Sequence, residues 1–191
     1  MSSLQRGFTL VEVMVVLVIV GLLLSMVNLN FSDRAAQQET EQFAQRLEVA
    51  FNRYREEAVF QNLDLGVAWV PGEFQLVGFY DLRQKSVVEG LTEEELSRLQ
   101  ENPWAPIDAA LAQAITIPET LQIRLIVNEE ELDPPEEPGE NGAEPALVFL
   151  SSDEYVPFTL ELMHEEDESF VLRIKGDGVG PIRRRLERFD D

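Results

Sequence analysis

The chain contains no cysteine and only one histidine, His164. The absence of cysteine excludes disulfide bonds, thiolate nucleophiles and zinc sites built on thiolates. His164 lies in a predicted acidic hairpin, and no serine or cysteine accompanies it in a pattern typical of nucleophilic catalysis. The sequence also offers no cluster of metal-ligating residues. We therefore expect no catalytic residue, no cofactor and no metal centre, and we do not predict an enzyme.

Positive charge is scarce, because 15 Lys and Arg stand against 36 Asp and Glu, for a formal net charge of −21. Arg6 and Glu12 cancel, so the whole acidic excess follows residue 31. Such a surface repels nucleic-acid phosphates and anionic lipid head groups, and it favours cationic partners, divalent ions or simply solubility. Arginines at residues 183–188 form one basic patch, which neighbouring acids dilute. We expect this patch to be a solvated tail or a salt-bridge partner, and we predict no nucleic-acid partner.

One long apolar run lies near the N-terminus, and Glu12 is its only charge. Residues 8–31 would form a helix about 36 Å long, enough to span a bilayer with some tilt. Arg6 and the start amine precede the run, which places the N-terminus on the cytoplasmic side. A carboxylate at mid-bilayer costs about 2.5–3.5 kcal/mol on an insertion scale. Three interpretations of the run compete. A secretory signal peptide would have a shorter apolar core, and a plain membrane anchor leaves Glu12 unexplained. Cleavage of the chain before the run would place Glu12 near a new N-terminus.

Residues 32–61 contain neither glycine nor proline and are rich in helix-forming residues. Small and apolar side chains recur at helical spacing and indicate one amphipathic face, which Phe51 widens. The face consists of Ala36, Thr40, Phe43, Leu47, Ala50, Tyr54 and Ala58. It lasts barely three heptads, so we expect it to pack on the chain's own domain. The opposite side, including Glu48, Asn52 and Arg55, is predicted to be solvated. We expect one helix of about 80 Å from Phe8 to Gln61.

After Gln61 the apolar period changes from that of a helix to that of strands. Thr92 and Glu95 have the spacing of a capping box and predict a short helix. Six segments are predicted to be strands, at residues 63–70, 73–80, 121–127, 146–150, 156–162 and 169–175. Strands that follow a helix without βαβ alternation indicate an α+β fold, in which the long N-terminal helix packs on an antiparallel β-sheet head, residues 62–191.

Residues 128–145 contain eight acids and four prolines but no base, and they predict a mobile, solvated loop. Carboxylates suit calcium, but no EF-hand spacing is present. Gly176–Gly180 has the glycine content of a phosphate loop, yet it lacks the Lys-Ser/Thr ending and a following helix. We therefore predict a turn at Gly176–Gly180 and no ligand for either segment.

The segment GFTLVE, from Gly7 to Glu12, follows a short basic leader and precedes the long apolar run. This combination resembles the class III signal of type IV pilins and type II secretion pseudopilins. The resemblance implies that residues 1–7 are a leader, that prepilin peptidase cuts between Gly7 and Phe8, and that Phe8 is N-methylated. It also implies that Glu12 is an assembly residue, whose carboxylate pairs with the Phe8 amine of a neighbouring subunit.

Segments from Arg55 onward indicate which members of these two families the chain resembles most. REEAVFQNLDLGVAW, LVFLSSDEYVPFTLEL and IKGDGVGPI are similar to the H-type minor pseudopilins of type II secretion and to FimT-like minor pilins. The implied protein has a single pass in the bacterial inner membrane, at residues 8–31, and its head in the periplasm. Its implied partners are other major and minor pseudopilins, an inner-membrane secretion platform and exported proteins. A type IV pilus minor pilin for pilus assembly or DNA uptake, and a plain anchored binding module, are the alternatives.

Overall fold

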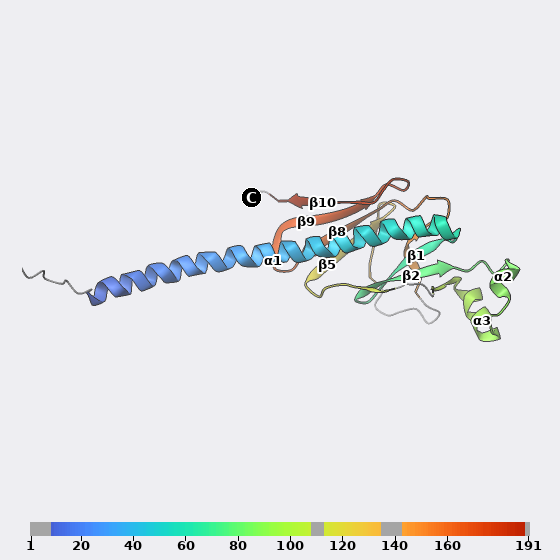
Figure 1. Cartoon of the computed structure of the whole chain (residues 1–191), viewed down its shortest axis with the longest axis horizontal. Helices are drawn as coiled ribbons and strands as arrows, with labels where there is room; N and C mark the ends of the chain where they lie inside the picture. Colours follow the sequence, from blue (N-terminus) through green and yellow to red (C-terminus); the bar gives the residue numbers. More distant parts are fainter. Residues whose placement is uncertain (1–8, 108–112, 135–142, 190–191) are drawn as a thin grey trace, which may run out of the picture.

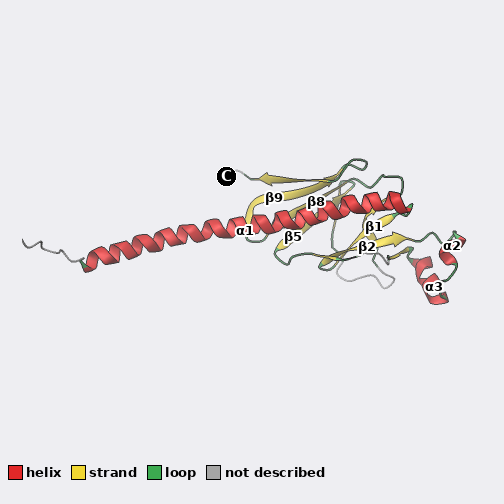
Figure 2. Ribbon diagram, in the orientation of Figure 1, coloured by secondary structure: helices red, strands yellow, loops and turns green. Residues whose placement is uncertain are grey.

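The computed structural model describes residues 9–107, 113–134 and 143–189, apart from the side chains of residues 24–33 and Ser86. In these ranges, one long helix packs on two antiparallel sheets, and short helices lie at one end of the head (Figures 1 and 2). The N-terminal half of the helix projects from the head, and its C-terminal half lies along the sheets (Figure 1). The α+β fold predicted from the sequence is therefore confirmed. The leader, residues 1–7, and Phe8 lie outside the described residues.

Helix α1 (Leu10–Gln61) runs for 52 residues, about 78 Å. Thr9 caps its start, since the Thr9 hydroxyl accepts a hydrogen bond from the Glu12 N–H at 3.3 Å. Asn62 ends the helix in the left-handed conformation, with φ 51° and ψ 43°. The next N–H, that of Leu63, bonds to the Ala58 carbonyl oxygen at 3.0 Å and closes the last turn.

The predicted membrane-spanning segment, residues 8–31, corresponds to the first part of α1. Within the ranges that the structure describes, no helix has an apolar stretch of the length needed to cross a membrane. Phe8 and the side chains of residues 24–33 fall outside those ranges. The membrane span therefore stays a prediction.

Two antiparallel sheets form the head. The first, sheet A, has the strand order β3-β2-β1-β7, and β4 also pairs with β2. Its strands are β1 (Leu65–Val70), β2 (Glu73–Phe79), β3 (Trp104–Pro106), β4 (Ile115–Thr116) and β7 (Pro145–Phe149). The second, sheet B, has the order β10-β9-β8-β5-β6; its strands are β5 (Leu121–Val127), β6 (Glu130–Leu132), β8 (Phe158–His164), β9 (Asp167–Gly176) and β10 (Arg183–Arg188). Two short helices, α2 (Lys85–Val88) and α3 (Glu93–Glu101), lie between β2 and β3.

The predicted amphipathic face of α1 packs into the core that both sheets share. Phe43, Leu47 and Phe51 are completely buried there. Thr40 is the polar member of the face, and its hydroxyl donates to the Ala36 carbonyl oxygen at 2.9 Å, so its burial leaves no unpaired donor. The Phe51 ring meets aromatic rings from both sheets, and α1 thereby joins them into one core.

The six predicted strands are confirmed as β1, β2, β5, β7, β8 and β9, with ends that differ by a few residues. The capping box is also confirmed, because the Thr92 hydroxyl accepts from the Glu95 N–H and the Glu95 carboxylate accepts from the Thr92 N–H. Gly176–Gly180 leads from β9 into β10, which agrees with a turn. Of the predicted acidic loop, residues 130–132 form strand β6, and residues 135–142 lie outside the described residues.

Two expectations are wrong, the second of them in part. The side of α1 that carries Glu48, Asn52 and Arg55 is not a solvated face, since these three side chains bond to residues 180–184. The arginines at residues 183–188 are not a tail, because they form β10, the edge strand of sheet B, but the expected salt bridge to an acidic neighbour is present between Arg184 and Glu48. Both errors have one cause. Strand β10 is rich in arginine and lacks the alternating apolar pattern that predicts a strand, and polar side chains of α1 bond to its edge and to the residues just before it.

Candidate assembly surface

The projecting part of α1 exposes an almost continuous apolar surface. Its large side chains are between 44% and 76% exposed, and they are Leu10, Val11, Val13, Met14, Val15, Val16, Leu17, Val18, Ile19, Val20, Leu22 and Leu23. Soluble monomers rarely expose apolar patches of this extent, which mark contact with a partner or with lipid. We call residues 10–23 the apolar rod.

Glu12 is the only charged residue of the apolar rod. It lies in the first helical turn, where the unpaired N–H groups and the helix dipole favour negative charge. Its backbone N–H bonds to Thr9, but its exposed carboxylate has no hydrogen bond or ion pair to any residue that the structure describes. The carboxylate is therefore available to a partner outside the chain.

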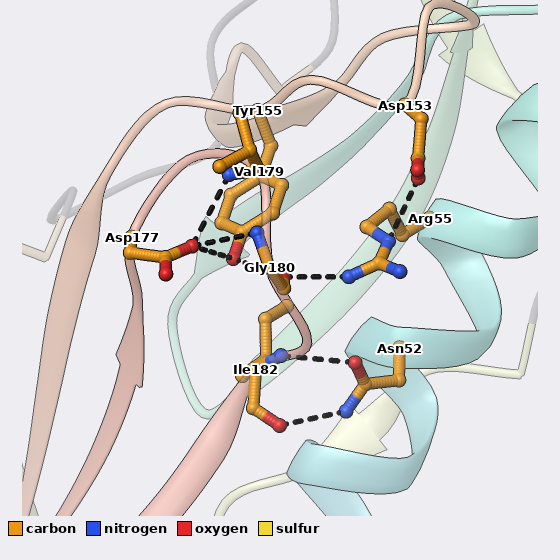
Figure 3. A network of polar contacts seen from close by, with 8 residues as sticks. All are labelled: Asn52, Arg55, Asp153, Tyr155, Asp177, Val179, Gly180 and Ile182. Atoms are coloured by element: carbon orange, nitrogen blue, oxygen red, sulfur yellow. Dashed lines mark hydrogen bonds and ion pairs between the residues drawn. The ribbon is translucent and has the colours of Figure 1, made fainter.

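A polar network fastens the other half of α1 to the segment between β9 and β10 (Figure 3). The Asn52 amide donates to the Ile182 carbonyl oxygen at 2.9 Å and accepts from the Ile182 N–H at 3.0 Å, as a neighbouring strand would. Arg55 donates to the Gly180 carbonyl oxygen at 2.6 Å, and its Nε lies 2.9 Å from a carboxylate oxygen of Asp153. We call these five residues the helix lock.

Asp177 shapes the turn that directs the Gly180 carbonyl oxygen at Arg55 (Figure 3). One Asp177 oxygen accepts from the Gly180 N–H at 2.7 Å and from the Val179 N–H at 3.2 Å. The Tyr155 hydroxyl donates to the Gly180 carbonyl oxygen at 2.6 Å. The Gly180 and Val179 N–H groups lower the pKa of Asp177, whereas burial raises the pKa of Tyr155. The turn is thus built for an ionised carboxylate and a neutral phenol.

Two further contacts hold α1 to sheet B, on either side of Phe43. Glu48 accepts from the Arg184 N–H and also pairs with the Arg184 guanidinium. His164 is buried; its Nδ1 accepts from the Glu166 N–H at 3.1 Å, so Nε2 carries the hydrogen directed at Glu39, 3.2 Å away. The lone histidine therefore connects the β8–β9 hairpin to α1, a role that no sequence pattern indicated.

The site residues predicted from the sequence fall in one region, but the structure describes only part of it. Glu12 lies near the tip of the apolar rod, whereas Gly7 and Phe8 lie outside the described residues. The helix lock was missed because its two halves are about a hundred or more residues apart in the chain. Within the described ranges, no group of three or more His, Cys, Asp or Glu could hold a metal ion.

A long N-terminal helix, exposed and apolar over residues 10–23 and packed on an antiparallel head in its second half, defines the class of pilin-like proteins. Comparison with known families agrees, since residues 2–28 match the prokaryotic N-terminal methylation motif. The fold resembles the solution structure of Escherichia coli GspH, with a TM-score of 0.53 and 16% identity over 80% of this chain and 90% of that one.

Relatives of nearly the same length carry one name. Type II secretion system protein H of Klebsiella michiganensis is 30% identical over 92% of this chain and 93% of its own. The protein of that name from Pseudomonas aeruginosa is 25% identical over 96% of this chain and 98% of its own. The chain belongs to the type II secretion system protein H family, and the H-type resemblance is confirmed.

Proposed function

We propose that this chain is a minor pseudopilin subunit that is cut between Gly7 and Phe8 by prepilin peptidase, N-methylated at Phe8, and assembled into a periplasmic filament. Residues 8–31 anchor it in the bacterial inner membrane as a single pass, and the head lies in the periplasm. The observation that carries the proposal is the apolar rod, whose one carboxylate, Glu12, lies four residues after the proposed new N-terminus.

Glu12 has a direct physical role in this proposal. The new Phe8 amine is positively charged at neutral pH, with a reference pKa of about 7.7–8.0. When helices pack side by side, the amine of one subunit pairs with the Glu12 carboxylate of its neighbour and sets the axial register. Removing one partner of a buried pair costs about 3–5 kcal/mol, since the other charge is left uncompensated. The pair therefore selects the correct packing.

The head has a structural role, with no catalytic step of its own. Its partners are the peptidase, the other major and minor pseudopilins and the inner-membrane secretion platform. The growing filament helps to move folded proteins outward, and the head meets either neighbouring subunits or exported proteins. The helix lock supports this role, because it makes the head and α1 one body.

The processing step is tested by the intact mass of the protein extracted from membranes of its native host. We expect a chain that begins at Phe8 and carries one added methyl group. A chain that retains Met1 or Ser2 would contradict the proposal, and an anchored periplasmic binding module would then be the better description.

The assembly step is tested by Glu12→Lys. We expect this variant to insert and to be cleaved, but its recovery with the other pseudopilins should fall by at least about a hundredfold, since a loss of about 3–5 kcal/mol corresponds to a factor of more than about 10². Glu56→Lys is the matched control, because Glu56 is an exposed acid on the head half of α1. Normal secretion from Glu12→Lys would show that the pair is not needed.

A further inference from the structure

The face of sheet B that points away from α1 carries a row of alternating charges. Leu160, Leu162 and Ile174 of β8 and β9 point into the core, so the residues between them point outward. From β6 to β10 the outward row consists of Glu131, Arg124, Glu161, Arg173 and Glu187. Arg124 lies 2.7 Å from Glu131 and 3.6 Å from Glu161, and Arg173 lies 2.7 Å from Glu161 and also pairs with Glu187.

Three cations beside this row have no such partner. Lys175, Arg183 and Arg185 are exposed, and none of their side chains forms a hydrogen bond or ion pair with any residue that the structure describes. Arg183 is directly opposite Lys175 in the β9–β10 ladder, and Arg185 is directly opposite Arg173. Like charges in directly opposite positions destabilise a sheet. We call Lys175, Arg183 and Arg185 the β9–β10 cation cluster.

The cation cluster is unusual in this chain, which has 36 acids and only 15 bases. The nearby acids Glu161 and Glu187 are already paired with Arg173. Lys175, Arg183 and Arg185 line a hollow of about 520 Å³, together with Thr159 and these two paired acids. A surface that keeps unpaired cations in a concavity, at a cost to its own sheet, has the features of a site for a complementary anionic surface.

We propose that the β9–β10 cation cluster docks a carboxylate-rich surface of a neighbouring pseudopilin of another kind; this inference rests on the proposed function. A second copy is disfavoured because two chains of net charge −21 repel each other. Lipid head groups are disfavoured by distance. Arg184, which lies between Arg183 and Arg185 of the cluster, bonds to Glu48, about 25 Å along α1 from the predicted span end at residue 31, whereas screening limits such attraction to about 8 Å.

The test places a photoreactive amino acid at Thr159, which is opposite Lys175 in the β8–β9 ladder. The full chain is expressed in its native host, and the product is identified by mass spectrometry. We expect a cross-link to another pseudopilin, in a peptide rich in Asp and Glu. The same probe at Gln122, on the same face but near the other end of β5, is the positional control and should give little product.

Charge reversal supplies the second arm. The combined variant Lys175→Glu, Arg183→Glu and Arg185→Glu should lower the cross-link yield by about tenfold, the effect expected for three exposed ion pairs. Arg53→Glu, which reverses an exposed arginine of α1, should change the yield by less than about twofold. The corresponding triple Gln variant should give an intermediate yield. Thermal unfolding of each purified variant verifies that the fold is kept, because the triple Glu variant still has like charges at the opposite positions 175 and 183, although it places a carboxylate opposite Arg173.

The possible outcomes separate the two proposals. A cross-link to lipid, to a second copy alone or to no protein, from a chain that is processed and recovered with other pseudopilins, would overturn the docking site but not the proposed function. A cross-link yield that does not change on charge reversal would also overturn the docking site. An unprocessed chain that still cross-links to an acidic peptide would support docking and contradict assembly. Failure of both measurements would remove both proposals.

Discussion

Asp177 shows how one carboxylate can set the shape of a segment that many contacts depend on. Its oxygen holds the N–H groups of Val179 and Gly180. A Cβ atom at Gly180 would lie 2.9 Å from an Asp177 oxygen, so a larger residue there would displace the Asp177 carboxylate. The turn in this geometry points the Gly180 carbonyl oxygen at Arg55. A local hydrogen-bond pattern thus positions one end of the helix lock.

The pH dependence of stability tests this account of Asp177. Because the folded-state pKa of Asp177 is lowered, its ionised form stabilises the fold above its ordinary pKa, near 3.9. This contribution is lost as the pH falls through the lower folded-state pKa. We expect Asp177→Asn to melt at a lower temperature than the parent chain at pH 7, and the gap to close below about pH 4. Circular dichroism melting over a pH series measures it.

Glu56→Gln is the control for that series, because Glu56 is exposed and its side chain bonds to no residue of the turn. Its melting temperature should follow that of the parent chain at every pH. A gap between Asp177→Asn and the parent chain that stays constant as the pH falls would show that the charge of Asp177 is unimportant.

Residue-scale contacts were the least predictable part of the chain. The helical period correctly placed Phe43, Leu47 and Phe51 in the core, because burial repeats with the turn of the helix. The same period assigned Asn52 and Arg55 to solvent. It depends only on which residues are hydrophobic, so it cannot show that a distant segment of backbone lies beside them. Their partners, Ile182 and Gly180, lie 130 and 125 residues away.

At the scale of elements, α1 is what holds the two sheets together. Phe51 lies 6.2 Å from the ring centre of Phe74 in β2 and 6.2 Å from that of Phe149 in β7. Its ring centre is also 6.0 Å from that of Phe158 in β8. These rings belong to sheet A in the first two cases and to sheet B in the third. A single side chain of the helix therefore contacts both layers.

Truncation of this side chain should be severe. We expect Phe51→Ala to lower the free energy of unfolding by about 3–5 kcal/mol, because it removes buried apolar contacts and leaves a cavity. Phe60→Ala is the matched control on the same helix, since the Phe60 side chain is 85% exposed, and its effect should stay within about 0.5 kcal/mol. Chemical denaturation of both variants measures the difference. Equal losses would contradict a central role for Phe51.

The elements that the sequence predicted share a strong apolar pattern, and those that it missed lack one. Leu121–Val127 was predicted with the observed bounds of β5. Strand β10 was missed because its helix-facing residues include Arg184 and Arg188, which bond to Glu48 and Gln37 of α1 instead of entering the core. Strands β3, β4 and β6 are only two or three residues long. Such short pairings depend on neighbours and carry almost no period of their own.

For the whole molecule, net charge should outweigh any local basic patch in the encounter with nucleic acid. Even with the β9–β10 cation cluster, the chain carries a formal charge of −21. We expect no binding to duplex DNA at about 0.15 M salt, because binding requires net neutralisation of phosphates by cations. A gel shift with the full chain in detergent tests this. Binding in the micromolar range that disappears on reversing the cation cluster would contradict the prediction.

The outer strands of both sheets are protected against pairing with strands of another molecule. In sheet B, Asn52 and Glu48 of α1 occupy backbone groups of Ile182 and Arg184 at the β10 side, and the other outer strand, β6, is short and acidic. In sheet A, both outer strands of the main path, β3 and β7, contain a proline, Pro106 and Pro145. Covered, short or proline-bearing borders resist recruitment of strands from another molecule. Heads held side by side at very high local concentration can therefore touch through side chains without fusing into amyloid-like stacks, which keeps a filament of such subunits reversible.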